Sequence, residues 1–284
     1  MSARMTSRLL SGRRKPGRLV GSCAVLLVLI ALVALIVPLL LSNDYATTNL
    51  DNRLAPPTTS GGHLFGTDEL GRDLFARTLL GIQVSLFVAV IASIVSLGIG
   101  VAYGALAGYV GGKLDAVMMR AVDALYALPF IFFVILLMVA FERNFLLIFV
   151  AIGAINWLDM ARIVRGQTIS LKHREFVDAA RLAGVSTAGI IWRHITPNLF
   201  GVVVVYLTLT IPQAILFESF LSFLGLGVQE PQTSLGALVS NGVSQMESAP
   251  WLLIIPASIL AIILLSFNFL GDGLRDIVDP KKET

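Results

Sequence analysis

The chain has 284 residues, of which 56% are hydrophobic and only 14% are charged, and its mean hydropathy is +0.84. Soluble domains contain about a quarter charged residues, so this composition excludes an ordinary soluble protein. The net charge of +3 is not gathered into a basic stripe on a soluble face, which argues against a nucleic-acid partner. A helix needs about 20 apolar residues to cross a bilayer, where free backbone groups find no partner.

Six stretches meet that length and predict an all-α polytopic membrane protein with six transmembrane helices. They are residues 19–41, 84–107, 121–141, 145–163, 199–223 and 252–270. The first stretch follows a cluster of basic residues, as a signal peptide does, but a cleaved signal has an apolar core of only about 7–15 residues. We therefore expect this stretch to be retained as a span. Its cysteine, Cys23, is the only one in the sequence, so no intramolecular disulfide can form.

The distribution of Lys and Arg predicts the orientation, because these residues accumulate on the cytoplasmic side of membrane proteins. Most of the 21 lie in the two terminal tails and in the loops at 108–120 and 162–198. Both termini are therefore expected in the cytoplasm. The chain then divides into a cytoplasmic tail, a first span, an extracytoplasmic segment, a transmembrane domain and a second cytoplasmic tail, at residues 1–18, 19–41, 42–83, 84–270 and 271–284.

The extracytoplasmic segment contains the sequence LFGTDELGRDLFARTLLG at residues 64–81. Thr67 or Asp68 can cap a short helix there, and the leucines that follow suit a helix face on the membrane surface. We interpret this stretch as an amphipathic lead-in to the second span. Contact with a ligand is the alternative.

A stripe of small residues marks one face of the second span. Gly100, Gly104 and Gly108 recur every four residues. Close backbone approach drives helix pairing in lipid, so we expect this face to pack against another helix. The alternative is that membrane helices simply contain more glycine than soluble ones.

A long polar loop, residues 164–198, interrupts the apolar spans on the basic side and contains EFVDAARLAGVSTAGIIWRHITP. Periodicity predicts a helix over residues 175–183, with an alanine-rich face and a charged face. Gly184 can adopt the left-handed conformation that ends a helix, Ser186 can cap a second helix, and Pro197 is expected to stop it. The pattern predicts two helices joined by a sharp turn beneath the membrane. From periodicity alone, a helix pair lying along the membrane surface remains the alternative.

No motif for ATP hydrolysis or metal binding is visible. A phosphate-binding loop is spelled G-x-x-x-x-G-K-[ST], and the nearest match, at Gly112 and Lys113, has Ala107 for the first glycine and Leu114 for the hydroxyl residue. Three histidines and one cysteine give no zinc spacing, and no histidine pairs with a nearby nucleophile in a known motif. We therefore expect no enzymatic activity, metal or cofactor in this chain.

The polar loop resembles the EAA signature of permeases in binding-protein-dependent ABC importers, through Asp178-Ala179-Ala180, Gly184 and Pro197. The sequence departs from that signature at Asp178, where glutamate is usual, and at Thr196, where leucine is common. In this family the short helix is a coupling helix that docks in a cleft of the ATP-hydrolysing subunit. The resemblance implies a coupling role for these residues: Glu175, Asp178, Ala179, Ala180, Arg181, Gly184, His194 and Pro197.

Three further blocks look like the C-type permease subunit of the dipeptide, oligopeptide and nickel importers. They are FGTDELGRD at 65–73, FLSFLGLGVQEP at 220–231 and FNFLGDGLRDIVDP at 267–280. Other stretches of the sequence are most similar to oligopeptide permeases. The resemblance implies a type I ABC importer permease fold in the bacterial inner membrane.

The same resemblance implies the partners. A second permease would share the translocation path, two cytoplasmic ATPase subunits would hold ATP and Mg²⁺, and an extracytoplasmic binding protein would deliver the peptide through the lipid-embedded pair. Import of dipeptides or nickel is an alternative within the family. An ion-driven secondary transporter and a polytopic membrane enzyme are alternatives from other classes, but the sequence shows no clear internal repeat and no clustered catalytic residues.

Ionisable groups at membrane depth are costly, so each is a candidate for function. Glu218 lies well inside the fifth span, flanked by Phe217 and Phe220. We expect these three residues to be candidates for the translocation path, with Glu218 near the amino end of a peptide. For Glu218 a hydrogen bond between helices is the alternative. Asp159 lies three residues before Arg162, which predicts an interfacial ion pair.

Overall fold

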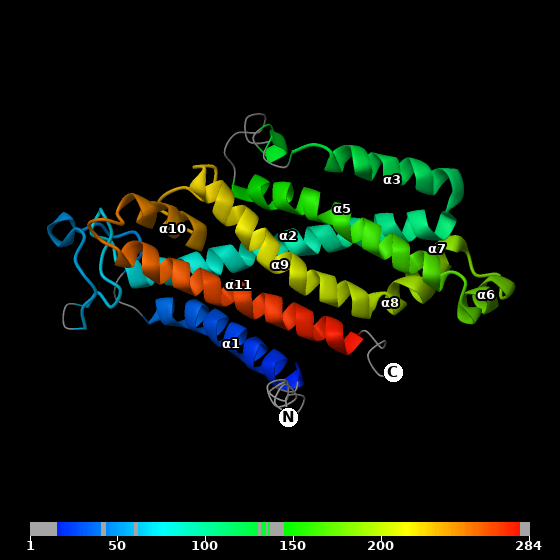
Figure 1. Cartoon of the computed structure of the whole chain (residues 1–284), viewed down its shortest axis with the longest axis horizontal. Coiled ribbons are helices and arrows are strands. Elements are labelled where there is room, and N and C mark those ends of the chain that lie inside the picture. Colours follow the sequence, from blue (N-terminus) through cyan, green and yellow to red (C-terminus); the bar gives the residue numbers. More distant parts are fainter. Residues whose placement is uncertain are drawn as a thin grey trace, which may run out of the picture.

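The computed structural model describes residues 16–40, 44–59, 62–129, 132–134, 136 and 145–278. Within them the chain is helical apart from connecting segments and one isolated bridge between Thr67 and Asp73. Long helices run along the long axis of the molecule, with α10 (Leu235–Ser244) near one end and α6 (Glu175–Leu182) at the other (Figure 1). The prediction of an all-α fold is confirmed.

Among the described residues, six long helices form the bundle. They are α1 (Pro16–Ile36), α2 (Leu74–Val110), α3 (Gly112–Tyr126), α5 (Phe145–Leu171), α9 (Phe200–Phe223) and α11 (Trp251–Val278). The shorter helical segments, besides α6 and α10, are η1 (Val37–Leu39), η2 (Leu50–Asn52), α7 (Thr187–Gly189), η3 (Ile190–Ile195) and α8 (Thr196–Asn198). The beginning of α1 and the end of α11 are directed toward the α6 end of the bundle (Figure 1).

Four helices in the described part of the chain are long and apolar enough to cross a membrane: Leu19–Leu39, Leu74–Val110, Phe200–Phe223 and Trp251–Val278. They match the first, second, fifth and sixth predicted spans. Helix α5 overlaps the fourth and has 27 residues, about 40 Å at 1.5 Å per residue. The third predicted span, 121–141, lies mostly outside the described residues, so the count of six spans stays a prediction.

The expected surface helix before the second span is not formed. Neither Thr67 nor Asp68 caps a helix; the cap is Asp73, whose carboxylate accepts a hydrogen bond from the backbone N–H of Ala76, 2.8 Å away. Helix α2 therefore starts at Leu74, ten residues earlier than the predicted span, and both Leu74 and Leu79 are buried. Leu74 and Leu79 face the core because tertiary packing continues the long helix beyond the predicted span, whereas Leu70 is exposed.

The predicted loop at 108–120 is mostly helix. Helix α2 runs to Val110, and two glycines with positive φ, Gly111 at +71° and Gly112 at +60°, make the turn into α3. Only glycine adopts such angles without strain, so a two-residue turn can reverse the chain. The first six residues of the third predicted span consequently belong to α3.

The glycine stripe of α2 packs against α5, as predicted. A Cβ atom added at Gly100 would lie 2.6 Å from the Cβ of Met160, and one at Gly108 would lie 2.7 Å from the backbone oxygen of Arg165. At Gly104 the backbone oxygen of Ala161 is closer still. These distances leave no room for a side chain, so the two helix backbones touch along three turns.

Candidate functional site

Helix α6 ends in the sharp turn that the sequence predicted. Gly184 has φ of +75°, and the backbone N–H groups of Gly184 and Val185 donate to the carbonyl oxygens of Arg181 and Ala180, each at 3.0 Å. This pair of reversed hydrogen bonds is the Schellman motif, which satisfies the last carbonyls of a helix. No atom lies within 4 Å of the position that a Cβ would take at Gly184, so only its backbone angle favours glycine.

The exposed face of α6 differs in part from the expected one. Phe176, Ala179 and Ala183 are exposed and free to meet another surface, but Ala180 is 6% exposed and packs with Val177 into the core formed by α2, α5 and η3. The predicted alanine face therefore divides between the protein's own core and the outside.

Charged residues of α6 contact the bundle at its rim. Arg181 donates a hydrogen bond to Asp178, 3.0 Å away, and another to the hydroxyl of Tyr109 on α2, at 3.3 Å. Its guanidinium also lies over the Tyr109 ring, 5.4 Å from the centroid. The hydrogen bond to Tyr109, which outweighs a small desolvation, raises the pKa of Arg181. Glu175 is exposed in the first turn of α6.

The second helix begins as predicted but does not stop at Pro197. Ser186 caps it by accepting a hydrogen bond from the backbone N–H of Gly189. The chain then continues through η3, a π-helical segment, into α8 and α9. Pro197 sits in the first turn of α8, where a missing N–H costs nothing, and the N–H of Thr196 reaches back five residues to Ile191. His194, half-buried in η3, contributes its backbone oxygen to the side chain of Asn198.

Two anchors fix the polar loop to the bundle, and neither was predicted. Arg165 on α5 donates two hydrogen bonds, of 2.5 and 2.6 Å, to the carboxylate of Asp115 on α3. Lys172 donates to the backbone oxygen of Gly108, at 3.1 Å. The hydrogen bonds from Arg165 lower the pKa of Asp115. Local sequence patterns do not predict contacts between residues fifty or more positions apart.

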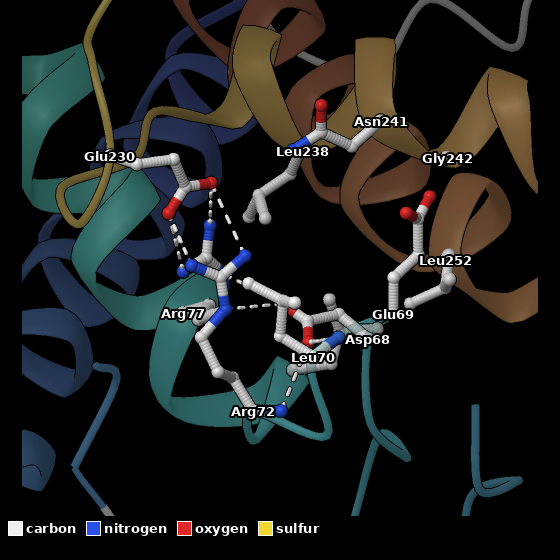
Figure 2. Close-up of a pocket in the computed structure, with 11 residues that line it drawn as sticks. Asp68, Glu69, Leu70, Arg72, Arg77, Glu230, Leu238, Asn241, Gly242 and Leu252 are labelled. Carbon is white, nitrogen blue, oxygen red and sulfur yellow. Dashed lines mark hydrogen bonds and ion pairs between the residues drawn. The ribbon is translucent and has the colours of Figure 1, made fainter. Parts of the chain in front are cut away.

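At the opposite end of the bundle, two arginines and two acids join the segment before α2 to the loop before α10. Arg72 and Arg77 both donate to the carboxylate of Glu230, with Arg77 Nη2 at 3.0 Å from Oε1 (Figure 2). Arg72 also donates to Asp68, at 2.7 Å. Arg77 is fully buried and Arg72 is 7% exposed, whereas half of the Glu230 side chain is exposed. We call these four residues the outer ion cluster.

The outer ion cluster lines a pocket of about 260 Å³. Partial burial works to raise the pKa of Glu230, but the hydrogen bond from Arg72 and the charge of Arg77 outweigh it and lower that pKa. The cluster was not predicted from the sequence, although the blocks at 65–73 and 220–231 each contain charged residues near glycines. Their proximity depends on the tertiary fold.

Glu218 is sealed inside the bundle. It is completely buried, and its carboxylate accepts hydrogen bonds from the hydroxyls of Ser222, at 2.7 Å, and Ser85 on α2, at 3.2 Å. Ser85 in turn accepts from the backbone N–H of Leu235 at the start of α10. This arrangement matches the alternative of an interhelical hydrogen bond and joins α2, α9 and α10.

The two phenylalanines beside Glu218 lie differently. Phe217 is partly buried and lines a cavity of about 680 Å³ between the end of α3 and the middle of α5 and α9. Phe220 is 49% exposed and lies outside that cavity. We call this space the mid-bundle cavity. Its lining includes one carboxylate, Asp159, and two amide side chains, Asn156 and Gln213, beside the rings of Tyr126 and Trp157.

The expected ion pair between Asp159 and Arg162 is absent. Arg162 instead donates to Asp123 on α3, at 2.8 Å, and its guanidinium lies 4.4 Å from the ring centroid of Tyr126. The carboxylate of α3 outcompetes the neighbour on the same helix because Arg162 points toward α3. Asp159 consequently remains exposed at the cavity. No group of three or more potential metal ligands occurs among the residues that the structure describes.

Comparisons with known proteins show the family to which this chain belongs. The family model described as "Binding-protein-dependent transport system inner membrane component" matches residues 100–284. The chain belongs to this family. It is thus a subunit of a multi-pass membrane assembly, and the matched region contains the α6 turn, Glu218 and the mid-bundle cavity.

Relatives match over nearly the whole chain. The oligopeptide transport system permease protein OppC of Escherichia coli K12 is 56% identical over 90% of this chain and 85% of its own length. OppC of Haemophilus influenzae is 53% identical, over 90% and 83%. The dipeptide permease protein DppC of Bacillus subtilis is 43% identical, over 95% and 84%.

The fold is that of a type I importer permease. A chain of the MetNI methionine ABC transporter, solved in inward-facing conformations, superposes with a TM-score of 0.50 and 18% identity, covering 70% of this chain and 94% of that chain. At this identity the likeness concerns the fold alone.

Proposed function

We propose that this chain is the permease subunit of an ATP-driven importer of oligopeptides. The observation that carries the proposal is 53–56% identity to two proteins named as oligopeptide permeases, over 90% of the chain. The 43% identity to a dipeptide permease makes dipeptide import the second candidate. The substrate reaches the chain from an extracytoplasmic binding protein and passes between this subunit and a second permease.

The α6 turn supports a coupling role. Exposed Phe176, Ala179 and Ala183 offer a small, flat, uncharged face, while Val177 and Ala180 fix the helix to the core of the same chain. A partner that moves α6 would therefore also move α2 and α5, because α6 is packed against the same core. Two cytoplasmic ATPase subunits, which would hold ATP and Mg²⁺, are the proposed partners, and α6 with both termini lies on their side of the inner membrane.

Driving force is measured directly in proteoliposomes. The chain is co-reconstituted with the proposed second permease, ATPases and binding protein of the same organism, and uptake of a labelled pentapeptide is followed. We expect uptake to require ATP on the side of the membrane that carries the ATPase subunits. Replacing ATP with a non-hydrolysable analogue should abolish uptake. Uptake sustained by a proton gradient without ATP would overturn the proposal. Competition by unlabelled dipeptide, pentapeptide or Ni²⁺ then separates the three substrate classes.

A further inference from the structure

The mid-bundle cavity contains polar groups that lie within two of the predicted spans. Asp159 lies four residues before the end of the fourth predicted span, 145–163, and Gln213 lies about 15–20 Å from either end of α9, at 1.5 Å per residue. Both side chains are exposed. An exposed amide at the middle of a spanning helix, as at Gln213, faces a water-filled or protein-lined path, because hydrocarbon offers it no partner.

These groups have unused hydrogen-bonding capacity. Asn156 is only 7% exposed, and its buried amide nitrogen has no hydrogen-bond partner. No hydrogen bond or ion pair joins Asp159 or Gln213 to another described residue. The carboxylate of Asp159 thus stands uncompensated beside two amide side chains. Buried polar groups are normally satisfied, so the unpaired amide nitrogen of Asn156, in a cavity that also holds an accessible carboxylate, points to a ligand.

We propose that the mid-bundle cavity receives the amino end of a passing peptide. Asp159 supplies the negative charge for the ammonium group, and Asn156 and Gln213 supply hydrogen bonds to the first peptide groups. The apolar wall, which includes Trp157 and Phe217, leaves room for variable side chains. This proposal rests on the proposed function and specifies which end of the substrate this subunit contacts.

The geometry favours Asp159 over Glu218 for this task. Glu218 is completely enclosed and its oxygens already accept from Ser85 and Ser222, so no ligand reaches it. The neighbouring cation, Arg162, is held by Asp123 and therefore does not neutralise Asp159. A peptide ammonium needs only one accessible carboxylate with amide acceptors nearby, and the cavity provides that set.

A labelling experiment tests the cavity without relying on transport. In the assembled complex in nanodiscs, Cys23→Ala removes the native thiol and Gln213→Cys places a new one in the cavity. We expect a cationic methanethiosulfonate to react roughly tenfold faster than an anionic one, because the Asp159 charge concentrates cations in a site of reduced dielectric. Asp159→Asn should remove that preference. Glu247→Gln removes an exposed acid between α10 and α11 that does not line the cavity, so it should leave the preference for the cationic reagent unchanged.

Equal rates for the two reagents with Asp159 present, or no reaction at position 213, would overturn the proposal. The second arm measures uptake of a labelled pentapeptide at saturating loaded binding protein. We expect Asp159→Asn to lower the uptake rate at least tenfold and Asp159→Glu to restore most of it, with the yield of assembled complex unchanged in both. Wild-type uptake by Asp159→Asn would also overturn it. If the wild-type complex shows no ATP-dependent peptide uptake, the proposed function fails, and the labelling arm still decides whether the cavity selects cations.

Discussion

The turn after α6 depends on the left-handed conformation of one residue, Gly184. Its φ of +75° costs a residue with a Cβ about 1–2 kcal/mol, although no neighbouring atom would clash. We predict that Gly184→Val leaves the protein inserted but uncouples ATP hydrolysis from transport, because the turn rearranges to escape the strain. The measurement is substrate-stimulated ATPase activity in the reconstituted complex. Gly184→Asn is the matched control, since asparagine tolerates this conformation, and normal stimulation in Gly184→Val would contradict the prediction.

The serine cage around Glu218 predicts a structural effect. Glu218→Gln keeps the shape and an acceptor oxygen, and the serine hydroxyls can rotate toward it, so the midpoint of thermal unfolding in detergent should change little. Glu218→Leu removes the acceptor of the buried Ser85 and Ser222 hydroxyls; Ser222 keeps Ser234 within 3.3 Å, but the unsatisfied Ser85 hydroxyl costs about 1–3 kcal/mol. We predict a clear loss of assembled complex for the leucine variant only. Full assembly of Glu218→Leu together with lost transport would assign Glu218 to the path instead.

Sequence alone located the residues that act through local geometry. Gly184 and Ser186 were predicted because a left-handed end and a cap depend on neighbours within four positions. Asp159 and Glu230 acquire their surroundings from helices far away in the sequence. The Asp159–Arg162 prediction was wrong for this reason, because a carboxylate on α3 lay closer to the guanidinium than the neighbour on the same helix.

At the scale of the helices, the α2–α5 contact offers a test with an internal control. We predict that Gly104→Val disrupts folding, because the new side chain would meet the backbone of Ala161, which cannot move aside as a flexible side chain could. Overpacking of this kind costs about 1–3 kcal/mol or more. Gly98 lies on the same helix with nothing within 4 Å of its Cβ position, so Gly98→Val should fold normally. The measurement is the monodisperse fraction on size-exclusion chromatography after mild heating, and equal loss in both variants would contradict the prediction.

Helix boundaries were the least predictable part of the fold. Apolar composition marks the part of α2 that meets lipid, but not the ten residues that extend it outward under cover of α10 and α11. Pro197 was expected to stop a helix, yet the π-helical segment before it removes the need for the missing N–H. Both differences arise because packing and local hydrogen-bond shifts can continue a helix past residues that would end it in isolation.

For the whole molecule, the outer ion cluster joins segments about 150 positions apart and connects the start of α2 to the loop before α10. Its four charges balance in pairs, so removing one acid leaves two buried arginines with a single partner. Because half of the Glu230 side chain meets solvent, screening limits what the cluster contributes. We therefore expect Glu230→Gln to lower the midpoint of thermal unfolding by a few degrees at neutral pH.

The pH dependence of that loss follows from the lowered pKa of Glu230. A carboxyl that is more acidic in the folded state than its ordinary value of 4.5 stabilises the fold fully above that pH, and the contribution disappears as the pH falls through the lower folded value. The midpoint difference between wild type and Glu230→Gln should thus be constant at neutral pH and shrink progressively below about pH 4.5. Glu247→Gln, an exposed acid outside the cluster, should show no such difference at any pH. A difference that stays constant or grows on acidification would mean that Glu230 stabilises the outer end through its shape rather than its charge.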